Sequence, residues 1–518
     1  MQWLKRIRIV VAIFIFFALT LIFLDFGNVI PVGLYSFFVS TQLIPSFIRT
    51  LVVLSSASFG IFFVLVVTVL FGRVYCSTLC PLGILQDIVI RIAKRINRRR
   101  RFQYKKQYYT LHYFLFVLTG IFAFSGSVIL LNLFEPFSNY GRILSNLMSP
   151  LLVLANNMFG YILGHFGFMF LFQIPILHIN PVSVLASLSF LTLVTYLSYN
   201  HGRLFCNLLC PAGAFLGLLS RFSFFKIVID KNNCKECGLC ERVCKANCIQ
   251  SSLMEIDFAA CVGCFNCLAA CPTIGMSYKR RWTKLSNKSN ETNVGRRNVL
   301  KISVLPALGL LMPIDRVEDA AGRSQNGFNE NRRHPISPPG SLGVERFSSL
   351  CTACHLCVSS CPTQVLLPSF LEYGIAGVFQ PKMNYDASYC NFDCVLCSQI
   401  CPTGAILPLD VSSKKEAQIG RAQFVREDCI VVKKNIDCGA CSEHCPTKAV
   451  FMVPYSEYLM IPEINNDICI GCGACEHACP ARPNKAIYVK PNTIHQKAHR
   501  PKMKKAEQTF DSSQEFPF

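Results

Sequence analysis

The run CTACHLCVSSCP at 351–362 and the run CIGCGACEHACP at 469–480 share one spacing, Cys-x2-Cys-x2-Cys-x3-Cys-Pro. CVGCFNCLAACP at 261–272 repeats this spacing, and three further runs vary it. In iron–sulfur proteins, three cysteines of such a run hold one [4Fe–4S] cluster and the fourth ligates the cluster of a second run. Six runs therefore predict three interlocked pairs and six [4Fe–4S] clusters. Zinc sites usually show two close cysteine pairs separated by a long insert, a pattern that these runs do not follow.

The three variant runs differ from this spacing in small ways. CKECGLCERVC at 234–244 lacks the proline, CNFDCVLCSQICP at 390–402 has one extra residue in its first gap, and CIVVKKNIDCGACSEHCP at 429–446 has a long first gap that we expect only to widen a loop. Interlocking ligation predicts six ligand sets. These sets are Cys234, Cys237, Cys240 and Cys271; Cys261, Cys264, Cys267 and Cys244; Cys351, Cys354, Cys357 and Cys401; Cys390, Cys394, Cys397 and Cys361; Cys429, Cys438, Cys441 and Cys479; and Cys469, Cys472, Cys475 and Cys445.

Composition limits the class of protein. The chain has 518 residues, 52% of them hydrophobic, which fits a membrane portion joined to soluble domains. Its 29 cysteines include 24 in the six runs, four in two Cys-x3-Cys-Pro motifs, and Cys248, which we interpret as a packed thiol. Thiolates committed to iron argue against a disulfide scaffold. The net charge of +21 comes from loops that flank apolar stretches, which favours a membrane protein over a nucleic-acid-binding protein.

Four apolar stretches predict an α-helical membrane domain. The stretches near 9–25, 50–71, 110–133 and 181–199 are long enough, or nearly so, to cross a bilayer as helices. A fifth, near 150–172, is interrupted by asparagine, glycine and histidine residues, and we expect a re-entrant or interfacial segment on the outer side. The alternative is a true fifth span, which would invert the topology downstream.

Basic residues orient this domain. Lys5, Arg6 and Arg8 precede the first span, a basic loop covers 91–106, and further arginines and lysines follow residue 202. Cytoplasmic loops are enriched in these residues, so all three segments are expected inside. The cysteine-rich segment at 226–281 directly follows an inside loop, which predicts a cytoplasmic location for it.

The membrane half is internally repeated. GRVYCSTLCPLGILQDIVIRI at 72–92 resembles GRLFCNLLCPAGAFLGLLSRF at 202–222, which indicates a parallel duplication of a two-helix unit. Pro81 and Pro211 suit the first turn of a helix, so Cys80 and Cys210 are expected at N-cap positions.

These motifs supply the candidate redox residues Cys76, Cys80, Cys206 and Cys210. The two pairs could converge into one four-thiolate site, form redox-active disulfides, or bind copper, haem or another iron cluster; thiols packed at a turn are the competing interpretation. Polar residues inside a membrane are often functional, so four more residues are candidates for contact with a quinone headgroup, against a simple loop or interface role. They are His112, Glu135, His165 and His178.

The predicted organisation has five parts. They are a four-helix membrane domain at 1–225, a two-cluster ferredoxin domain at 226–281, a connecting segment at 282–344, a four-cluster double ferredoxin domain at 345–490 and a polar tail at 491–518. The fold class is thus an α-helical membrane domain plus α+β ferredoxin-like domains. Short strands, KIVID at 226–230 and IGMSY at 274–278, are expected to flank the ligand loops of the first ferredoxin domain.

The connecting segment holds GRRNVLKISVLPALGLLMP at 295–313. A paired arginine before a short apolar stretch resembles a twin-arginine export signal and a possible fifth transmembrane helix. This predicts a periplasmic location for the C-terminal ferredoxin domain; the alternative is an ordinary basic loop, with both ferredoxin domains cytoplasmic. The polar segment at 315–344, which includes Arg332, Arg333 and the PISPPG stretch at 335–340, is expected to be a flexible linker. The residues after 491 are expected to form a disordered tail.

Residues 1–281 resemble the NapH-type membrane subunits of periplasmic nitrate reductase systems, and more widely NosR and polyferredoxin relatives. The resemblance rests on four spans, two GRxxCxxxCPxG motifs and a two-cluster domain. Residues 295–490 resemble the NapG-type four-cluster ferredoxin, with its arginine pair at 296–297. Lys245 departs from the family pattern, because a proline usually follows the fourth cysteine of a run.

The resemblance implies a quinol dehydrogenase subunit of the bacterial plasma membrane. Its electrons would pass through six [4Fe–4S] clusters to a periplasmic reductase or a cytochrome c, and its partners would be lipid and the quinone pool, with no nucleic acid. An alternative from another class is a maturation or maintenance factor for a metalloenzyme, NosR-like or copper-reducing. Clusters on opposite sides of a bilayer are too far apart for one electron hop, so either quinone diffusion or the Cys-x3-Cys-Pro thiols must connect them, or the cytoplasmic pair receives electrons from another donor.

Overall fold

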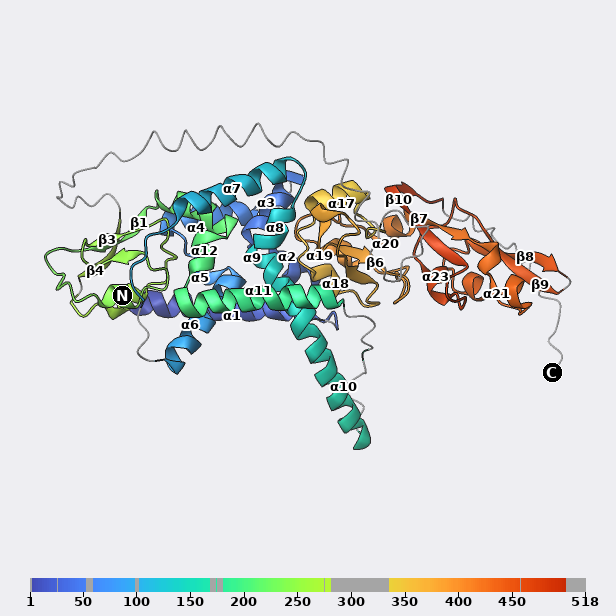
Figure 1. The fold of residues 1–518 in the computed structure, drawn as a ribbon, viewed down its shortest axis with the longest axis horizontal. Helices are drawn as coiled ribbons and strands as arrows, with labels where there is room; N and C mark the ends of the chain where they lie inside the picture. The colour runs from blue at the N-terminus through green and yellow to red at the C-terminus, as the bar shows by residue number, and fades with distance from the viewer. Residues whose placement is uncertain are drawn as a thin grey trace, which may run out of the picture.

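A helical body lies between two cysteine-rich modules, one at each end of an elongated molecule (Figure 1). The computed structural model describes residues 2–25, 27–52, 59–97, 102–167, 174, 180–273, 275–280, 335–456 and 458–499. The twin-arginine-like segment and His178 lie outside these residues.

The helical body contains the described helices up to residue 220. They are α1 (Gln2–Leu24), α2 (Val32–Ser40), α3 (Leu43–Val52), α4 (Phe59–Phe71), α5 (Tyr75–Thr78), α6 (Pro81–Ile96), α7 (Tyr109–Phe124), α8 (Ile129–Phe134), α9 (Pro136–Ile143), a π-helical turn (Leu144–Met148), α10 (Ser149–His165), α11 (Pro181–His201), α12 (Leu204–Leu208) and α13 (Pro211–Ser220).

Proline and capping residues fix where several of these helices begin. Cys80 and Cys210 are the N-caps of α6 and α13, each followed by proline, as predicted. At the start of α11 the Asn180 side chain accepts hydrogen bonds from the backbone N–H groups of Val182 and Ser183, at 3.0 and 3.4 Å. The Asn180 and Cys210 side chains thus satisfy backbone donors that would otherwise lack partners, whereas Cys80 makes no such side-chain hydrogen bond.

Three described helical segments are long and apolar enough to cross a membrane: Gln2–Leu24, Pro136–His165 and Pro181–His201. The predicted spans at 50–71 and 110–133 correspond to shorter helices, α3 with α4 and α7 with α8. The four-span arrangement therefore remains a prediction. The asparagines and glycines of 150–165 do not interrupt the helix there. α10 projects from the body in a direction that crosses those of α1 and α11 (Figure 1).

α1 and α11 run in opposite directions along the long axis of the molecule (Figure 1). The beginning of α1 lies at the first module, where Arg8 shares the carboxylate of Asp87 with Lys245. The beginning of α11 lies at the second module, where the Asn180 amide donates to the carbonyl of Pro368 at 2.9 Å. The two modules therefore sit at opposite ends of the antiparallel helices.

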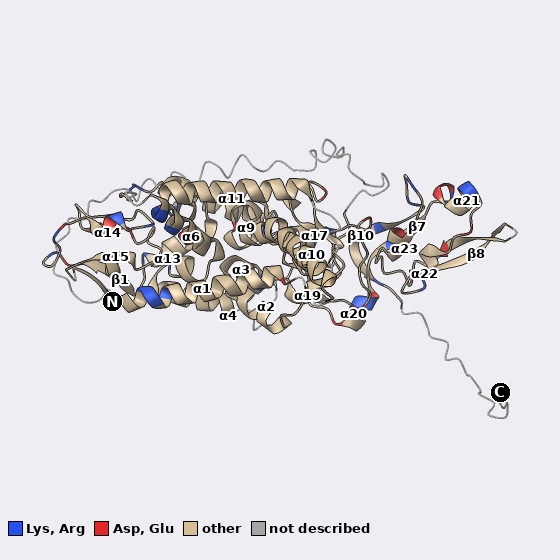
Figure 2. Ribbon diagram, turned by 90° about the horizontal axis from the view of Figure 1, so that it is seen from below, with Lys and Arg blue, Asp and Glu red and all other residues tan. Residues whose placement is uncertain are grey.

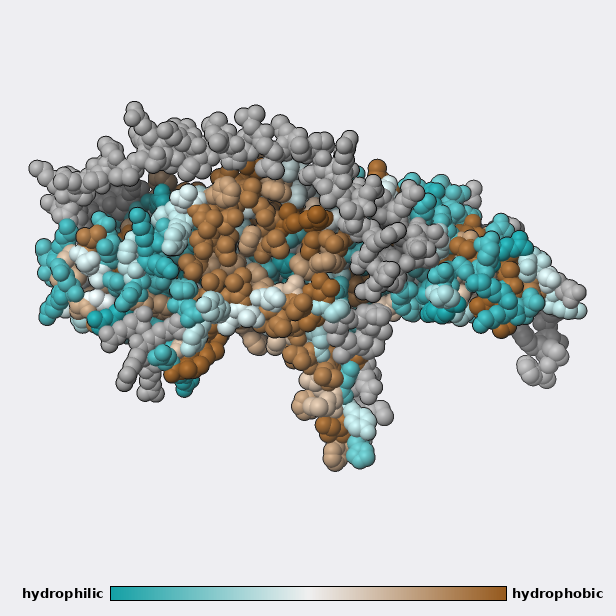
Figure 3. All heavy atoms as spheres, viewed as in Figure 1, coloured by the Kyte–Doolittle hydropathy of each residue, from teal (hydrophilic) through white to brown (hydrophobic). Residues whose placement is uncertain are grey.

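The outer surface of the body is apolar. Figure 3 shows brown residues gathered over the helices and teal residues over both end modules. Phe14, Phe17 and Val66 are more than half exposed on this surface. Figure 2 shows basic residues of α1 and α6 at the end of the body that meets the first module. An apolar belt bounded by polar ends is the distribution that a bilayer requires.

The first module is a small α+β unit. Strand β1 (Phe225–Ile229) pairs antiparallel with β4 (Met276–Arg280), which confirms the predicted flanking strands. Inside this frame lie α14 (Leu239–Arg242), the short pair β2 (Ile249–Gln250) and β3 (Glu255–Ile256), and α15 (Asn266–Ala270).

The second module contains three antiparallel strand pairs: β5 with β6, β7 with β10, and β8 with β9. The strands are β5 (Leu366–Pro368), β6 (Pro381–Met383), β7 (Ala417–Phe424), β8 (Val450–Ser456), β9 (Leu459–Ile464) and β10 (Ile487–Lys497). The helices are α17 (Val344–Leu350), α18 (Leu356–Ser359), α19 (Leu396–Ile400), α20 (Val411–Glu416), α21 (Ile430–Lys434), α22 (Ala440–Glu443) and α23 (Ala474–Ala478), with 3-10 turns at Ile375–Gly377 and Arg426–Asp428.

Three expectations about this module were wrong. The PISPPG stretch is not a flexible linker, because Ile336 is buried in the core and Gly340 accepts a hydrogen bond from the Leu407 N–H at 2.9 Å. The residues just after 490 are not a tail, since β10 continues past a bulge and pairs again with β7 through Lys497. The long first gap of the run at 429–446 folds into α21, which ends at Asn435 in a left-handed conformation.

Candidate electron-transfer centres

The thiols of the second module gather in fours. Cys357 is close enough to interact electrostatically with Cys351, Cys354 and Cys401. Cys397 interacts in the same way with Cys390, Cys361 and Cys394. In each group three thiols come from one run and the fourth from the other run, as the interlocking pattern predicts.

The two remaining runs bring together one group of four thiols and one of three. Cys475 lies among Cys472, Cys469 and Cys445, and Cys441 lies beside Cys438 and Cys479. Cys429, the fourth predicted ligand of the last group, is buried in the same core. The two pairs of groups are joined where the Cys390 N–H donates to the carbonyl of Cys472 at 3.0 Å. The four groups therefore follow one another away from the helical body.

The first module brings its thiols together less symmetrically. Cys267 interacts with Cys264, Cys261 and Cys244 on the side that faces the helical body. On the far side Cys240 interacts with Cys234 and Cys237. Cys271 belongs to a loop that packs on this group through Thr273, whose hydroxyl donates to the carbonyl of Asn233 at 2.9 Å.

Cys248 has a closer relation to the predicted ligands than its interpretation as a packed thiol implied. Its sulfur lies 3.5 Å from the sulfur of Cys244. This hydrogen bond lowers the pKa of the Cys244 thiol to about 7, although burial opposes the change. Cys248 therefore lies directly beside Cys244, a predicted ligand whose run lacks the usual following proline.

The donor set fits iron–sulfur clusters. The ligands are thiols throughout, and every described cysteine is a free thiol. Burial raises the pKa of Cys354 to about 12, so such thiols need iron to become thiolates.

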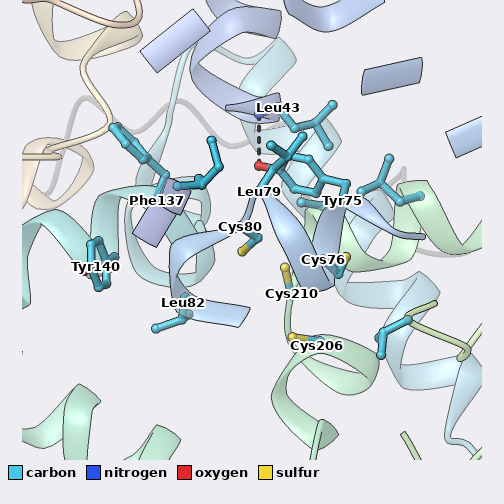
Figure 4. Packing of buried hydrophobic residues seen from close by; sticks show 14 of the residues in the cluster. Leu43, Tyr75, Cys76, Leu79, Cys80, Leu82, Phe137, Tyr140, Cys206 and Cys210 are labelled. Carbon is cyan, nitrogen blue, oxygen red and sulfur yellow. Dashed lines mark hydrogen bonds between the residues drawn. The ribbon is translucent and has the colours of Figure 1, made fainter. Parts of the chain in front are cut away.

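The thiols of the two Cys-x3-Cys-Pro motifs converge in the middle of the helical body. Figure 4 shows Cys76, Cys80, Cys206 and Cys210 close together, at helix starts and in short turns of the two repeats. All four are nearly fully buried, at 4 to 5% exposure. The Cys210 sulfur accepts a hydrogen bond from the Gly213 N–H at 3.3 Å, and the Cys206 thiol donates to the side-chain oxygen of Gln86 at 3.3 Å.

The arginine of each repeat reaches across to the other repeat. Arg73 donates to the carbonyl of Cys206 at 3.2 Å and to Asn207 Oδ1 at 3.0 Å. Arg203 donates to the carbonyl of Cys76 at 2.7 Å. Both guanidinium groups are almost inaccessible to solvent. The GR pair that precedes each motif therefore holds the opposite motif in place.

The glycine after each motif makes room for this crossing. A Cβ on Gly83 would collide with the carbonyl of Cys76 and lie 2.7 Å from Arg203 Nη1. A Cβ on Gly213 would collide with the carbonyl of Cys206 and lie 3.0 Å from Arg73 Nη2. The whole GRxxCxxxCPxG pattern is thereby explained by close approach of two turns related by the duplication.

Sequence reasoning missed Asp87, which lies at the junction of the body and the first module. Its carboxylate lies 3.0 Å from Arg8, 2.7 Å from Arg203 and 3.2 Å from Lys245. Lys245 stands where a proline usually follows the fourth cysteine of a run, and its ammonium group forms an ion pair with Asp87 of the helical body. An acidic residue on a helix that is otherwise basic and apolar is the only sequence signal for this network.

Three of the four polar residues proposed for quinone contact lie within the described residues. His112 is buried and its Nε2 lies 3.1 Å from the carbonyl of Cys210, and Glu135 caps α9 by accepting from the N–H groups of Phe137 and Ser138. His165 is exposed at the end of α10. His112 and Glu135 therefore have structural partners, and His178 lies outside the described residues.

A groove instead opens where α1 and α6 meet the first module. Its volume is about 340 Å³. Ile9, Ile13 and Ile88 are among its lining residues, together with basic residues and Asp87. The basic residues are Lys5, Arg8, Arg91, Lys94 and Lys245. Cys264 of the first module interacts electrostatically with Lys245 and Asp87, so the groove lies beside the body-facing thiol group.

Two protein families match the chain. A family described as a 4Fe-4S binding domain matches residues 55–100 and 181–230, which contain the two repeats of the helical body. A family described as a 4Fe-4S dicluster domain matches residues 350–405 and 434–482 of the second module. The second match agrees with the two pairs of thiol groups in that module.

Several known proteins are similar to parts of the chain. An uncharacterized protein of Methanocaldococcus jannaschii is 31% identical over 128 residues, 24% of this chain and 50% of that protein. The putative electron transport protein YccM of Escherichia coli K12 is 23% identical over 208 residues, 40% of this chain and 51% of YccM. The ferredoxin-type protein NapG of the same strain is 28% identical over 145 residues, 28% of this chain and 60% of NapG.

The chain thus spans about half to three-fifths of the length of these relatives. Three kinds of finding agree with one another. Three described helical segments are long enough to cross a membrane. 4Fe-4S domains match both repeats and the second module, and parts of the chain are similar to proteins named as electron-transport and ferredoxin-type proteins. The chain therefore contains ferredoxin-type 4Fe-4S domains in the helical body and in the second module.

Proposed function

We propose that this chain oxidises quinol in the plasma membrane and carries electrons across the bilayer to an acceptor on the outer side. The observation that carries the proposal is the placement of two ferredoxin modules at opposite ends of one apolar helical body. The groups at Cys351–Cys479 and Cys234–Cys271 would hold six [4Fe–4S] clusters as the predicted ligand sets. Such clusters pass single electrons when bound.

Charge supports the orientation. The basic residues of α1 and α6 lie at the end of the body that carries the first module, and basic residues accumulate on the cytoplasmic side of membranes. The first module would then be cytoplasmic and the second periplasmic. A twin-arginine route for the second module, as for a NapG-type ferredoxin, agrees with this orientation, and the first half would correspond to a NapH-type subunit.

The groove between α1, α6 and the first module is the proposed quinol site. Its isoleucines face the apolar belt, where a prenyl tail would lie: Ile13 is 60% exposed and Ile88 39% exposed. Its five basic side chains face the headgroup. Positive charge favours loss of a proton from the quinol hydroxyl, and the body-facing thiol group of the first module lies next to the groove. Quinol would release two electrons and two protons and leave as quinone.

Quinol-dependent bleaching of cluster absorbance in the purified protein tests the function. We expect an anaerobic pulse of menaquinol or ubiquinol to bleach the visible absorbance of the full chain, and a soluble high-potential acceptor to restore it. Absorbance that dithionite bleaches but quinol does not would contradict quinol oxidation. Reduction of Cu(II) without quinol turnover would instead favour a copper-reducing maintenance factor.

A bulky substitution tests the groove. Ile88→Trp narrows the groove, whereas Ile92→Trp places the same side chain on α6 at a residue that does not line it and is 52% exposed. We expect the first variant to raise the KM for quinol about tenfold or more, a loss of about 1.4 kcal/mol of binding, with unchanged iron content. Equal kinetics in the two variants would remove the groove from the proposal.

A further inference from the structure

We infer that Cys76, Cys80, Cys206 and Cys210 bind a seventh iron–sulfur cluster, inside the helical body and between the two ferredoxin modules. The inference extends the proposed function, on which its role in electron transfer rests. Cluster binding is one of several roles that the sequence allows for these thiols, and the structure favours it over the rest.

The arrangement of the four thiols suits a cluster better than disulfides. All four are free, which is not the structure of paired disulfides. They come from two repeats that meet face to face, so each repeat supplies two ligands. Iron–sulfur clusters with four cysteine ligands need this donor set.

Buried positive charge matches such a cluster. Four thiolates around an oxidised cluster core leave a net negative charge, which is costly to bury alone. Arg73 interacts electrostatically with Cys76, Cys206 and Cys210, and Arg203 with Cys206 and Cys76. Arg203 is also paired with Asp87 at 2.7 Å, whereas no carboxylate pairs with Arg73 among the described residues. Arg73 thus supplies a countercharge for a cluster.

An unpaired donor points into the same place. The side-chain oxygen of Gln86 accepts from the Cys206 thiol, which directs the amide to the thiol group. Gln86 is completely buried, and its Nε2 has no hydrogen-bond partner in the described part of the chain. An amide left unpaired beside a cysteine sulfur is suited to donate to a cluster sulfide, and such hydrogen bonds tune the potential.

The four-thiol site also lies between the thiol groups of the two modules. On one side Arg73 interacts with three of the four thiols and with Cys261 of the first module. On the other side Tyr75 interacts with Cys80 and with Glu135, and Glu135 interacts with Cys354 of the second module. Thiol groups therefore follow one another from the first module through the body to the second. A cluster here would divide one long electron transfer into shorter ones.

Quantitative Mössbauer spectroscopy of the full chain grown on ⁵⁷Fe tests the inference. We expect the variant with all four cysteines changed to serine to lose one cluster, about one seventh of the iron if the cluster is a cubane, while the other signals persist. Leu209→Met, between Cys206 and Cys210, is the matched packing control and should keep the wild-type iron content.

The outcomes separate this inference from the proposed function. Equal iron in wild type and the four-serine variant overturns the seventh cluster and leaves the six ferredoxin clusters untouched. Little iron in the wild type itself overturns both. If the four-serine variant does not fold, the wild-type count decides: six clusters refute the inference and seven support it.

A second variant gives a readout that does not depend on folding of the first. Gln86→Glu keeps the shape of the side chain but removes the amide donor. We expect the midpoint potential of one electron paramagnetic resonance signal to fall, because a hydrogen bond to cluster sulfur is lost, while the remaining signals stay in place. A potential profile identical to that of the wild type would contradict the role of Gln86 and the cluster beside it.

Discussion

Replacing Gly213 by alanine tests whether the crossed arginines hold the four-thiol site together. The added Cβ would collide with the carbonyl of Cys206, the acceptor of the 3.2 Å hydrogen bond from Arg73. Overpacking of this kind costs about 1–3 kcal/mol, and a lost hydrogen bond from a charged group costs about 1.5–3 kcal/mol. Alanine returns about 0.5–1 kcal/mol of helix stability, so the net loss is about 2–5 kcal/mol.

Gly120→Ala is the matched control, because Gly120 lies inside α7 and a Cβ there meets nothing within 4 Å. The assay is urea-induced loss of helical circular dichroism in detergent, together with iron content. We expect Gly213→Ala to unfold at lower urea concentration and to lose iron, and Gly120→Ala to unfold at the same or higher concentration. A Gly213→Ala protein as stable as Gly120→Ala would refute the crossed-arginine explanation of the motif.

Three more perturbations follow from the described contacts. Asp87→Asn should destabilise the chain by about 3–5 kcal/mol in urea unfolding, because Arg8, Arg203 and Lys245 lose the carboxylate that they share. As a control, Asp393→Asn breaks an exposed pair with Lys415 and should cost less than about 1 kcal/mol. Gly141→Ala should loosen the second module from the body, because its Cβ would collide with the carbonyl of Cys354, and hydrogen exchange near residues 351–360 should rise; unchanged exchange would contradict this contact. Burial lowers the pKa of His495 from 6.5 to about 4, so at this imidazole only the unfolded chain gains a proton as the pH falls below about 6.5. The free energy of unfolding should therefore drop by about 1.5 kcal/mol between pH 6.5 and pH 5. A His495→Gln protein with the same pH dependence would exclude this imidazole as the cause.

The cysteine runs can be recognised in the sequence because their spacing is local. The strands of the first module and the N-caps at Cys80 and Cys210 were confirmed for the same reason, since each depends on a few adjacent residues. The crossing of Arg73 and Arg203 could not be predicted in this way. It joins residues more than a hundred positions apart, and only the repetition of GR before each motif indicated that the arginines had a role.

The errors have a common physical cause. The PISPPG stretch has the composition of a linker, but Ile336 is buried in the core of the second module and Gly340 pairs with the distant Leu407. The residues after 490 are polar, yet backbone pairing with β7 does not depend on apolar side chains. In both places long-range packing overrides a local signal, and no local pattern in the sequence reports it.

The most direct test of electron transfer through the helical body uses quinone-free proteoliposomes. A membrane-impermeant reductant is added on the side of the first module, and the absorbance of the clusters in both modules is followed. We expect the clusters of the second module to be reduced without any quinone, and the four-serine variant to stop at the first module. Reduction of the second module only after quinone is added would show that electrons cross by diffusion, and would contradict a continuous line of thiol-bound clusters.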